Sequence, residues 1–503
     1  MQNNCHKETM YNFYYDESEH SRIINLKTIT GETYYDNFLS LVVGWDSSKE
    51  DTIKQKYLSF EKKYNDRKKK GELKSSTFKS NQFSNGFASF NKQNAEMLDD
   101  FLSIIDDDFL VYFSVESKIE YIILQLFRDY KNNFFVDMDS IKYSITKAIL
   151  VYWPDKVISA MYSDSTTFIS ALIEFFNNRI EINKKNLQLK KDENQKFESI
   201  ISILQGIESP ISIEWNYRIS FWGFDYFLKS KRIFNYNLAI DKEGEGKTLC
   251  AAKKVGIKNC IELESTEHFG LRIADMLVGI IGKLMKSIYT SLKDNSNENV
   301  SKILLDKSWF KLDEKQLSLY KKLYHILLEI NNDWWKIYSG FYADDLVCLL
   351  GLLDYINCFE SSAEIYENFD KHPEGCNAYI CNMLLEHFEI RKNKIPVRPI
   401  VSETKEYFRN NNGAKVYFDI HKQPKLPINV GENKYFVLSV GFDKNYNPLV
   451  TVADKPENQC FRLPEQLKEW AMFAVGLAKM GENIFPSDVV FSKIRGHYYA
   501  DVL

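Results

Sequence analysis

Three aspartates lie where packing alone would not place an acidic residue. Asp16 and Asp241 each end a predicted strand, and Asp275 lies within a mostly apolar run, residues 270–281. Burying a carboxylate costs free energy unless it is paired or bound to a metal. A two-metal phosphodiesterase needs at least three hard oxygen ligands from separate elements, because its two ions lie roughly 4 Å apart. Acids at the ends of two strands and on a later helix meet that need.

Each aspartate also has a structural interpretation. Asp16 could begin a turn with Ser18, and taken alone this is the commoner role for such a residue. Asp241 could cap a helix or a turn, and Asp275 could pair with an arginine or a lysine. The combination of the three is what favours metal-dependent phosphodiester chemistry.

The elements that must position these acids are predicted from hydrophobic periodicity and turn residues. Alternation within residues 11–46 predicts three sequential antiparallel strands, with residues 23–29 as the middle one. Further strands are expected at 109–115, 233–240 and 260–263, and helices at 49–65, 91–105, 247–254 and 266–284. Residues 118–205 and 300–390 read as helical, whereas short strands at 415–420, 435–442 and 449–452 and a helix at 464–479 predict a separate small domain.

Four short motifs occur in a characteristic order along the chain. They are Tyr14-Tyr15-Asp16-Glu17-Ser18, Glu72-Leu73-Lys74-Ser75-Ser76, the strand ending in Asp241, and Gly270-Leu271-Arg272-Ile273-Ala274-Asp275. In this order they resemble the prokaryotic family called domain of unknown function 3800, which is regarded as RNase H-like. The resemblance covers roughly residues 10–130 and 230–285. It implies that Asp16, Glu72, Asp241 and Asp275 are the catalytic acids and hold Mg²⁺ or Mn²⁺.

The chain departs from the family pattern at two positions. Glu19 stands where the family usually has glycine, and Arg272 replaces the usual glutamine. Arg272 could bind a scissile phosphate, or it could neutralise Asp275 and weaken the site. Lys74 is the second candidate for a phosphate contact.

Two further glutamates are candidate ligands of lower rank. Glu17 directly follows Asp16 and could be an additional metal ligand, and Glu116 ends the strand expected at 109–115. A solvated glutamate is the commoner outcome at such positions.

These predictions combine into an α/β protein: an RNase H-like mixed sheet with a helical insertion, a helical region and a small C-terminal α+β domain. The RNase H-like domain is expected in two parts, at 1–130 and 216–290, with the helical insertion at 131–215 between them. The helical region is expected at 291–395 and the C-terminal domain at 396–503.

Composition sets limits on the function. The 503 residues carry a formal net charge of −4, so the chain as a whole is not a basic nucleic-acid binder, although a local basic groove is compatible with this charge. The eight cysteines form no Cys-x-x-Cys pair and are expected to be reduced thiols. The N-terminus has no apolar signal core and no apolar run reaches the ~20 residues of a membrane span, so we expect a cytoplasmic protein without a membrane partner. The resemblance to the prokaryotic family implies a bacterial source.

The leading hypothesis is a metal-dependent nuclease that hydrolyses RNA or DNA, with nucleic acid as its partner and, from the resemblance, a role in phage defence. The remaining domains would supply substrate selection, homo-oligomerisation or contact with a regulatory partner. The alternative is a non-catalytic nucleic-acid- or protein-binding module on an RNase H-like scaffold, with the pair Trp334-Trp335 as a partner surface. In a third hypothesis, the C-terminal domain senses a signal and gates the nuclease half.

Overall fold

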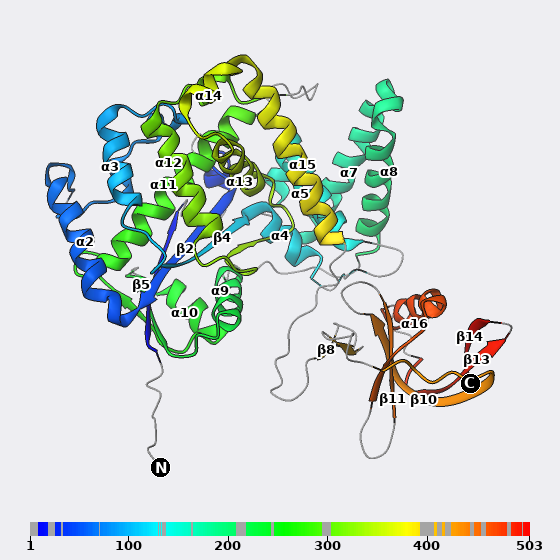
Figure 1. Ribbon diagram of the computed structural model, residues 1–503. Coiled ribbons are helices and arrows are strands. Elements are labelled where there is room, and N and C mark those ends of the chain that lie inside the picture. Colours follow the sequence, from blue (N-terminus) through cyan, green and yellow to red (C-terminus); the bar gives the residue numbers. More distant parts are fainter. Residues whose placement is uncertain are drawn as a thin grey trace, which may run out of the picture. The chain divides into compact units, whose positions relative to one another are not determined.

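The computed structural model forms two compact units (Figure 1). One comprises Met1–Arg128 and Ile141–Leu384, and the other comprises Asp129–Ser140 and Leu385–Leu503. The structure describes residues 9–18, 26–31, 34–69, 71–128, 130, 132, 137–161, 164–207, 218–242, 246–293, 303–392, 407–409, 415–417, 424–442, 447–453, 459–479, 484–494 and 496–503.

A six-stranded mixed sheet lies at the centre of the first unit. Its strands are β1 (Tyr11–Ser18), β2 (Asn37–Asp46), β4 (Leu110–Ser117), β5 (Tyr236–Asp241), β6 (Cys260–Leu263) and β7 (Ile337–Ser339). The order is β6-β5-β1-β2-β4-β7. Strand β2 is antiparallel to both β1 and β4, whereas the β1–β5, β5–β6 and β4–β7 pairs are parallel. The predicted α/β class with a mixed sheet is confirmed.

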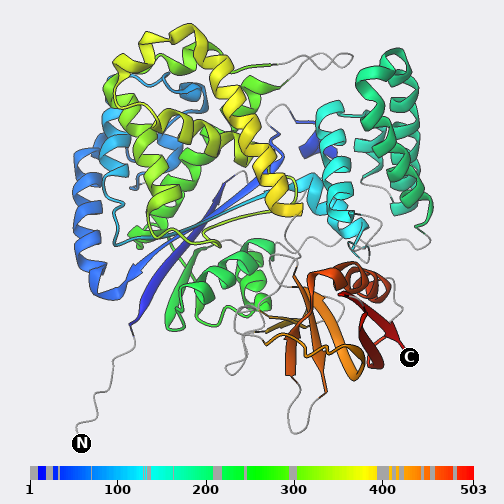
Figure 2. The same cartoon turned by 45° about the vertical axis from the view of Figure 1, so that its right-hand side comes forward.

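Helices cover both faces of this sheet (Figures 1 and 2). One face shares a core with α2 (Glu50–Lys63), α3 (Lys92–Leu102), α11 (Phe269–Leu292), α12 (Glu314–Tyr324) and α13 (Asp344–Asn357). The other face packs against α9 (Ile219–Ser230) and α10 (Lys247–Val255). Because side chains alternate along a strand, Tyr14 of β1 points into the first core, and Phe13 and Tyr15 point into the second.

The other helices of this unit follow the predicted helical segments closely. They are α4 (Lys118–Leu126), α5 (Met138–Tyr152), α6 (Asp155–Ala160), α7 (Ser165–Asn183), α8 (Leu187–Gln205), α14 (Ser362–Glu367) and α15 (His372–Lys392). The segment expected to be wholly helical at 300–390 also contains β7, which extends the sheet beyond β4. Its helices α12 and α13 complete the core beneath that sheet.

The predicted middle strand of the N-terminal meander is wrong. Leu26–Ile29 forms a helical turn, α1, and residues 19–25 lie outside the described residues. The third strand of the meander is instead β4, which arrives after α2 and α3. A few alternating apolar residues do not distinguish a strand from a helical turn, because a single turn buries Ile29 equally well.

The second unit contains a separate antiparallel sheet, as predicted. Its strands are β10 (Gly431–Phe442), β11 (Pro448–Val452), β12 (Gln459–Arg462), β13 (Ser487–Ile494) and β14 (His497–Val502), in the order β12-β11-β10-β13-β14. Helix α16 (Lys468–Lys479) contributes Ala471 and Ala474 to a core with Val437 and Val489. A further pair, β8 (Tyr407–Arg409) and β9 (Lys415–Tyr417), forms a two-stranded sheet.

Hydropathy places no membrane span in the described part of the chain, where every helix is too short or too polar to cross a bilayer.

Candidate active site

Asp16 and Asp241 lie on the neighbouring parallel strands β1 and β5. Asp241 ends β5, as predicted, but the prediction that Asp16 ends its strand is wrong, because β1 continues to Ser18 in its pairing with β2. Tyr15 of β1 pairs in register with Ile240 of β5, and each aspartate is the next residue along its strand. Alternation directs both carboxylates to the face that bears Tyr14, which is the face covered by α11. Two of the predicted acids are therefore neighbours although the sequence separates them widely.

Helix α11 lies unusually close to β1 because two glycines face the strand. A Cβ atom added at Gly270 would lie 2.4 Å from the ring of Tyr14, and one added at Gly282 would lie 2.8 Å from Oγ of Ser18. At Gly270 the overlap with the buried Tyr14 ring leaves no room for a side chain, whereas at Gly282 the Ser18 hydroxyl would have to rotate away. Asp275 lies between the two glycines on the helix, as Asp16 lies between Tyr14 and Ser18 on the strand.

Ser75 holds the Asp275 carboxylate from the loop that follows α2. Its backbone amide donates to Oδ2 at 2.9 Å and its hydroxyl donates to Oδ1 at 3.1 Å. Gly279 of α11 leaves room for this loop, since an added Cβ would lie 2.2 Å from the Cβ of Ser75. Burial raises the pKa of Asp275, while the Ser75 hydrogen bonds and the charges of Lys74 and Lys283 oppose that rise.

Lys74 connects Glu72 to the other acids. Its Nζ lies 2.8 Å from Oε1 of Glu72, a side chain that is only 6% exposed. The hydrogen bond to Glu72 raises the pKa of Lys74 most, and the charges of Asp275 and Asp241 raise it further. Burial raises the pKa of Asp241. The positive charge of Lys74 opposes this rise, and the negative charge of Glu72 adds to it. These side chains are thus close enough for their charges to act on one another.

The acids do not form a ready-made metal cage in this conformation. Within the described ranges, no group of three or more His, Cys, Asp or Glu side chains is arranged to hold one ion. The donor set nevertheless fits a divalent cation, because it consists of hard carboxylate oxygens and because Oε2 of buried Glu72 has no hydrogen-bond partner among the described residues. The Lys74 ammonium supplies positive charge next to these acids.

Glu17 and Glu116 do not join this group. Both point to the opposite face of the sheet, because Glu17 is one residue beyond Asp16 and Glu116 lies on the face of Tyr112. The hydroxyl of Tyr15 donates to Oε2 of Glu17 at 3.0 Å, and Ser114 donates to Oε1 of Glu116 at 3.1 Å. A role for Glu17 as an additional ligand of this site is therefore not supported by its position.

Arg272 is engaged within the protein. Its Nε donates to Oε1 of Glu61 at 2.8 Å, and Nη1 donates to the carbonyls of Ser265 and Thr266 at 2.7 and 3.0 Å. Both Arg272 and Glu61 are buried. The guanidinium thus ties α11 to α2, and neither role suggested by the sequence, phosphate binding or neutralisation of Asp275, matches these partners. Glu19 lies outside the described residues.

Three contributors to the site were not predicted from the sequence. Ser75 is adjacent to Lys74, Lys283 lies eight residues after Asp275 on α11, and Glu61 is the partner of Arg272. Two features of the sequence could have indicated these residues. Lys283 lies about two helical turns after Asp275, on the same face of the helix, and Ser75 belongs to the motif that contains Glu72 and Lys74. Glu61 and Arg272 are 211 positions apart in the sequence, so no local pattern signals their pairing.

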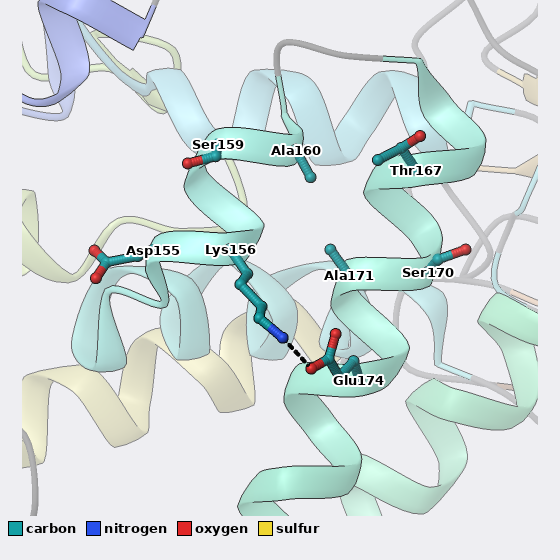
Figure 3. A pocket seen from close by; sticks show the side chains of 8 residues that line it. All are labelled: Asp155, Lys156, Ser159, Ala160, Thr167, Ser170, Ala171 and Glu174. Atoms are coloured by element: carbon teal, nitrogen blue, oxygen red, sulfur yellow. Dashed lines mark hydrogen bonds and ion pairs between the residues drawn. The ribbon is translucent and has the colours of Figure 1, made fainter.

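An open hollow of about 700 Å³ lies elsewhere in the first unit, between α6 and α7 (Figure 3). Small side chains such as Ala160, Ala171 and Ser170 line it, and the ion pair of Lys156 with Glu174 crosses it. It contains none of the predicted site residues.

Comparisons of this chain with protein-family models, with curated proteins and with solved structures find no match.

Proposed function

We propose that this protein is an RNase H-like, metal-dependent nuclease that hydrolyses phosphodiester bonds of RNA or DNA. The proposed site consists of Asp16, Glu72, Asp241 and Asp275. The fold proposal is supported by the antiparallel strands β1, β2 and β4, which are extended by β5 and β6 running parallel to β1. The resemblance of the four motifs to the domain of unknown function 3800 family points the same way.

One observation carries the functional proposal: acids from four separate elements converge at one edge of the sheet. The charges of Glu72, Asp241 and Asp275 act on a single ammonium group. Asp16 and Asp241 directly follow Tyr15 and Ile240, the last paired residues of β1 and β5. Concentrating carboxylates in one place raises their free energy, so structural packing alone gives no reason for this cluster. A site for divalent cations explains the cluster, since such ions stabilise neighbouring carboxylates.

The chemistry follows from the donor set. Mg²⁺ or Mn²⁺, when bound, would activate a water molecule and stabilise the leaving 3′-oxygen during in-line attack on phosphorus. Asp16, Glu72, Asp241 and Asp275 would hold the ions. Ser75 would orient Asp275 through its two hydrogen bonds, and Lys74 would contact a substrate phosphate. Hydrolysis breaks the bond between phosphorus and the 3′-oxygen and transfers the water hydroxyl to phosphorus.

The non-catalytic alternative also has an observation in its favour. Trp334 is 64% exposed, and the ring of the neighbouring Trp335 packs against Tyr226 of α9 at a tilt of 36°, with ring centroids 4.6 Å apart. An exposed aromatic side chain beside a rigid aromatic pair suits base stacking or a protein partner. This surface would serve a binding module whether or not the acidic site is active.

Cleavage assays decide between the two functions. The full-length protein should cleave members of a panel of single- and double-stranded RNA and DNA in Mn²⁺ or Mg²⁺ but not in EDTA. Asp16→Asn and Asp275→Asn should each reduce the rate at least about a hundredfold, which corresponds to about 2.7 kcal/mol of transition-state stabilisation. Asp370→Asn, which removes the exposed partner of Lys307, is the matched control and should retain full activity.

Activity that survives both active-site substitutions would mean a different site or a contaminating nuclease. Absence of cleavage with retained binding of a labelled oligonucleotide would favour the binding module. A plaque assay in cells that carry the wild type or Asp16→Asn tests the defence role.

A further inference from the structure

Lys74 occupies the place in the acidic cluster where positive charge is needed. Its ammonium forms an ion pair with Glu72, and the backbone next to it directs Ser75 to Asp275. Asp241 completes the acids whose charges act on this ammonium. The metal-free cluster is thus partly neutralised by a cation that belongs to the chain itself.

An ammonium and a divalent ion cannot both be close to the same carboxylates without repelling one another. This repulsion grows as the two charges approach, and it is twice as large for a divalent ion as for a monovalent ion at the same distance. Oε2 of Glu72 is buried and has no hydrogen-bond partner in the part of the chain that the structure describes, so this carboxylate retains a donor oxygen that Lys74 does not use. Glu72 is therefore a candidate metal ligand, but the neighbouring Lys74 ammonium disfavours the binding of a metal ion.

We propose that Lys74 changes partner when a metal ion binds. Without a metal ion its ammonium neutralises the acids, and a divalent cation that binds there displaces the ammonium toward a phosphate of the nucleic acid. This inference rests on the proposed nuclease function and concerns the regulation of the same site. Metal binding at this site exchanges the Lys74–Glu72 ion pair for a contact between Lys74 and a phosphate. Metal and nucleic acid consequently strengthen each other's binding, because one side chain couples the two equilibria.

The side chain of Lys74 has the freedom that this exchange requires. It is 43% exposed, and its flexible four-carbon stem allows the ammonium to reorient without movement of the backbone. The adjacent Leu73 is fully buried in the core and holds the loop in place. Glu72 and Ser75 can thus keep their positions while Lys74 moves between two partners.

Isothermal titration calorimetry with Mn²⁺ tests the competition directly. Lys74→Met removes the charge but keeps the apolar stem, and it should tighten Mn²⁺ binding at least about tenfold, which equals 1.4 kcal/mol. Lys56→Met is the matched control, since Lys56 is also 43% exposed and pairs with Asp106 outside the site. It should leave the Mn²⁺ affinity unchanged. Equal or weaker Mn²⁺ binding by Lys74→Met would overturn the inference.

Pulse labelling of lysines in the wild type tests the displacement without any substitution. A brief exposure to acetic anhydride, followed by mass spectrometry, should label Lys74 several-fold more in saturating Mn²⁺ than in EDTA, because a released ammonium reacts more readily. Lys56 serves as the internal standard and should not change. Equal or reduced labelling of Lys74 in Mn²⁺ would contradict release.

Binding of a short fluorescent single-stranded DNA tests the new partner of Lys74. Adding Ca²⁺, another cation with oxygen ligands, should strengthen DNA binding by the wild type more than by Lys74→Met. An equal gain in both proteins would count against the phosphate contact. Failure of the wild type to bind Mn²⁺ at all would refute the proposed nuclease site itself. A different result would refute only the exchange: Asp275→Asn abolishes Mn²⁺ binding, but Lys74→Met does not tighten it.

Discussion

Ser75 binds both oxygens of the Asp275 carboxylate, one through its amide and one through its hydroxyl, across 200 residues of sequence. This bond joins the loop that carries Glu72 and Lys74 to the helix that carries Asp275. The approach depends on Gly279, against which Ser75 rests. The geometry of the acidic site is thus set by a contact between two elements rather than by either element alone.

Gly279→Ala should destabilise the protein, although alanine normally stabilises a helix relative to glycine. The added methyl group would overlap the Ser75 side chain, and relieving such overpacking costs about 1–3 kcal/mol. Urea denaturation at neutral pH measures the free energy of unfolding. Ser75→Gly removes both side-chain atoms that the added methyl group would overlap, so it should relieve the clash in the double variant. Fully additive losses of the two single variants would mean that Ser75 is not the obstacle.

Asp275→Asn should stabilise the metal-free protein at neutral pH while it abolishes the proposed activity. Burial raises the folded-state pKa of Asp275 above its unfolded value, so the folded state binds the proton more tightly. The contribution of this group to stability is therefore present at low pH and is lost as the pH rises through the folded pKa. Thermal unfolding in EDTA at neutral pH should show a higher midpoint for the variant, and a lower midpoint would mean that its bonds with Ser75 outweigh burial.

Glu116 should make stability fall as the pH rises. Burial, supported by the charge of Glu120 and opposed by a hydrogen bond from Ser114, raises the pKa of Glu116 to about 8 from an ordinary value of 4.5. Between these two values the unfolded chain releases a proton that the folded protein keeps, so the free energy of unfolding decreases by up to about 1.4 kcal/mol per pH unit. Urea denaturation from about pH 5 to about pH 9 should give a flatter profile for Glu116→Gln than for the wild type. Parallel profiles would show that Glu116 is ionised throughout.

Arg272→Met should act on stability and not on substrate binding. Removal of the guanidinium leaves buried Glu61 without its main partner, and breaking a buried ion pair in this way costs about 3–5 kcal/mol. Lys68, 3.3 Å from Glu61, should offset a small part of the loss. The double variant with Glu61→Gln should recover stability in urea denaturation. A stable Arg272→Met protein with weakened nucleic-acid binding would instead restore the phosphate-contact hypothesis.

Much of the local structure follows from the sequence alone. Periodicity predicts β6 at its observed bounds, α10 to within one residue, and α2 and α3 to within three residues. It predicts residues 118–205 as helical but not their division into the separate helices α4 to α8. The alternation rule also implies that Glu17 and Asp16 face opposite sides of a strand, although the motif placed both in one site. These features are recoverable because burial on one face leaves a regular pattern in neighbouring residues.

Tertiary structure decided what neighbouring residues cannot encode. The sequence suggests Asp16, Asp241 and Asp275 as candidates, but only the parallel pairing of β1 with β5 and the glycine-lined approach of α11 bring them to one edge. It also decided that Arg272 binds Glu61, that Lys74 lies among the acids, and that β7 joins the first sheet. Partners far apart in the chain are selected by the free energy of the whole packed arrangement, which local periodicity does not contain.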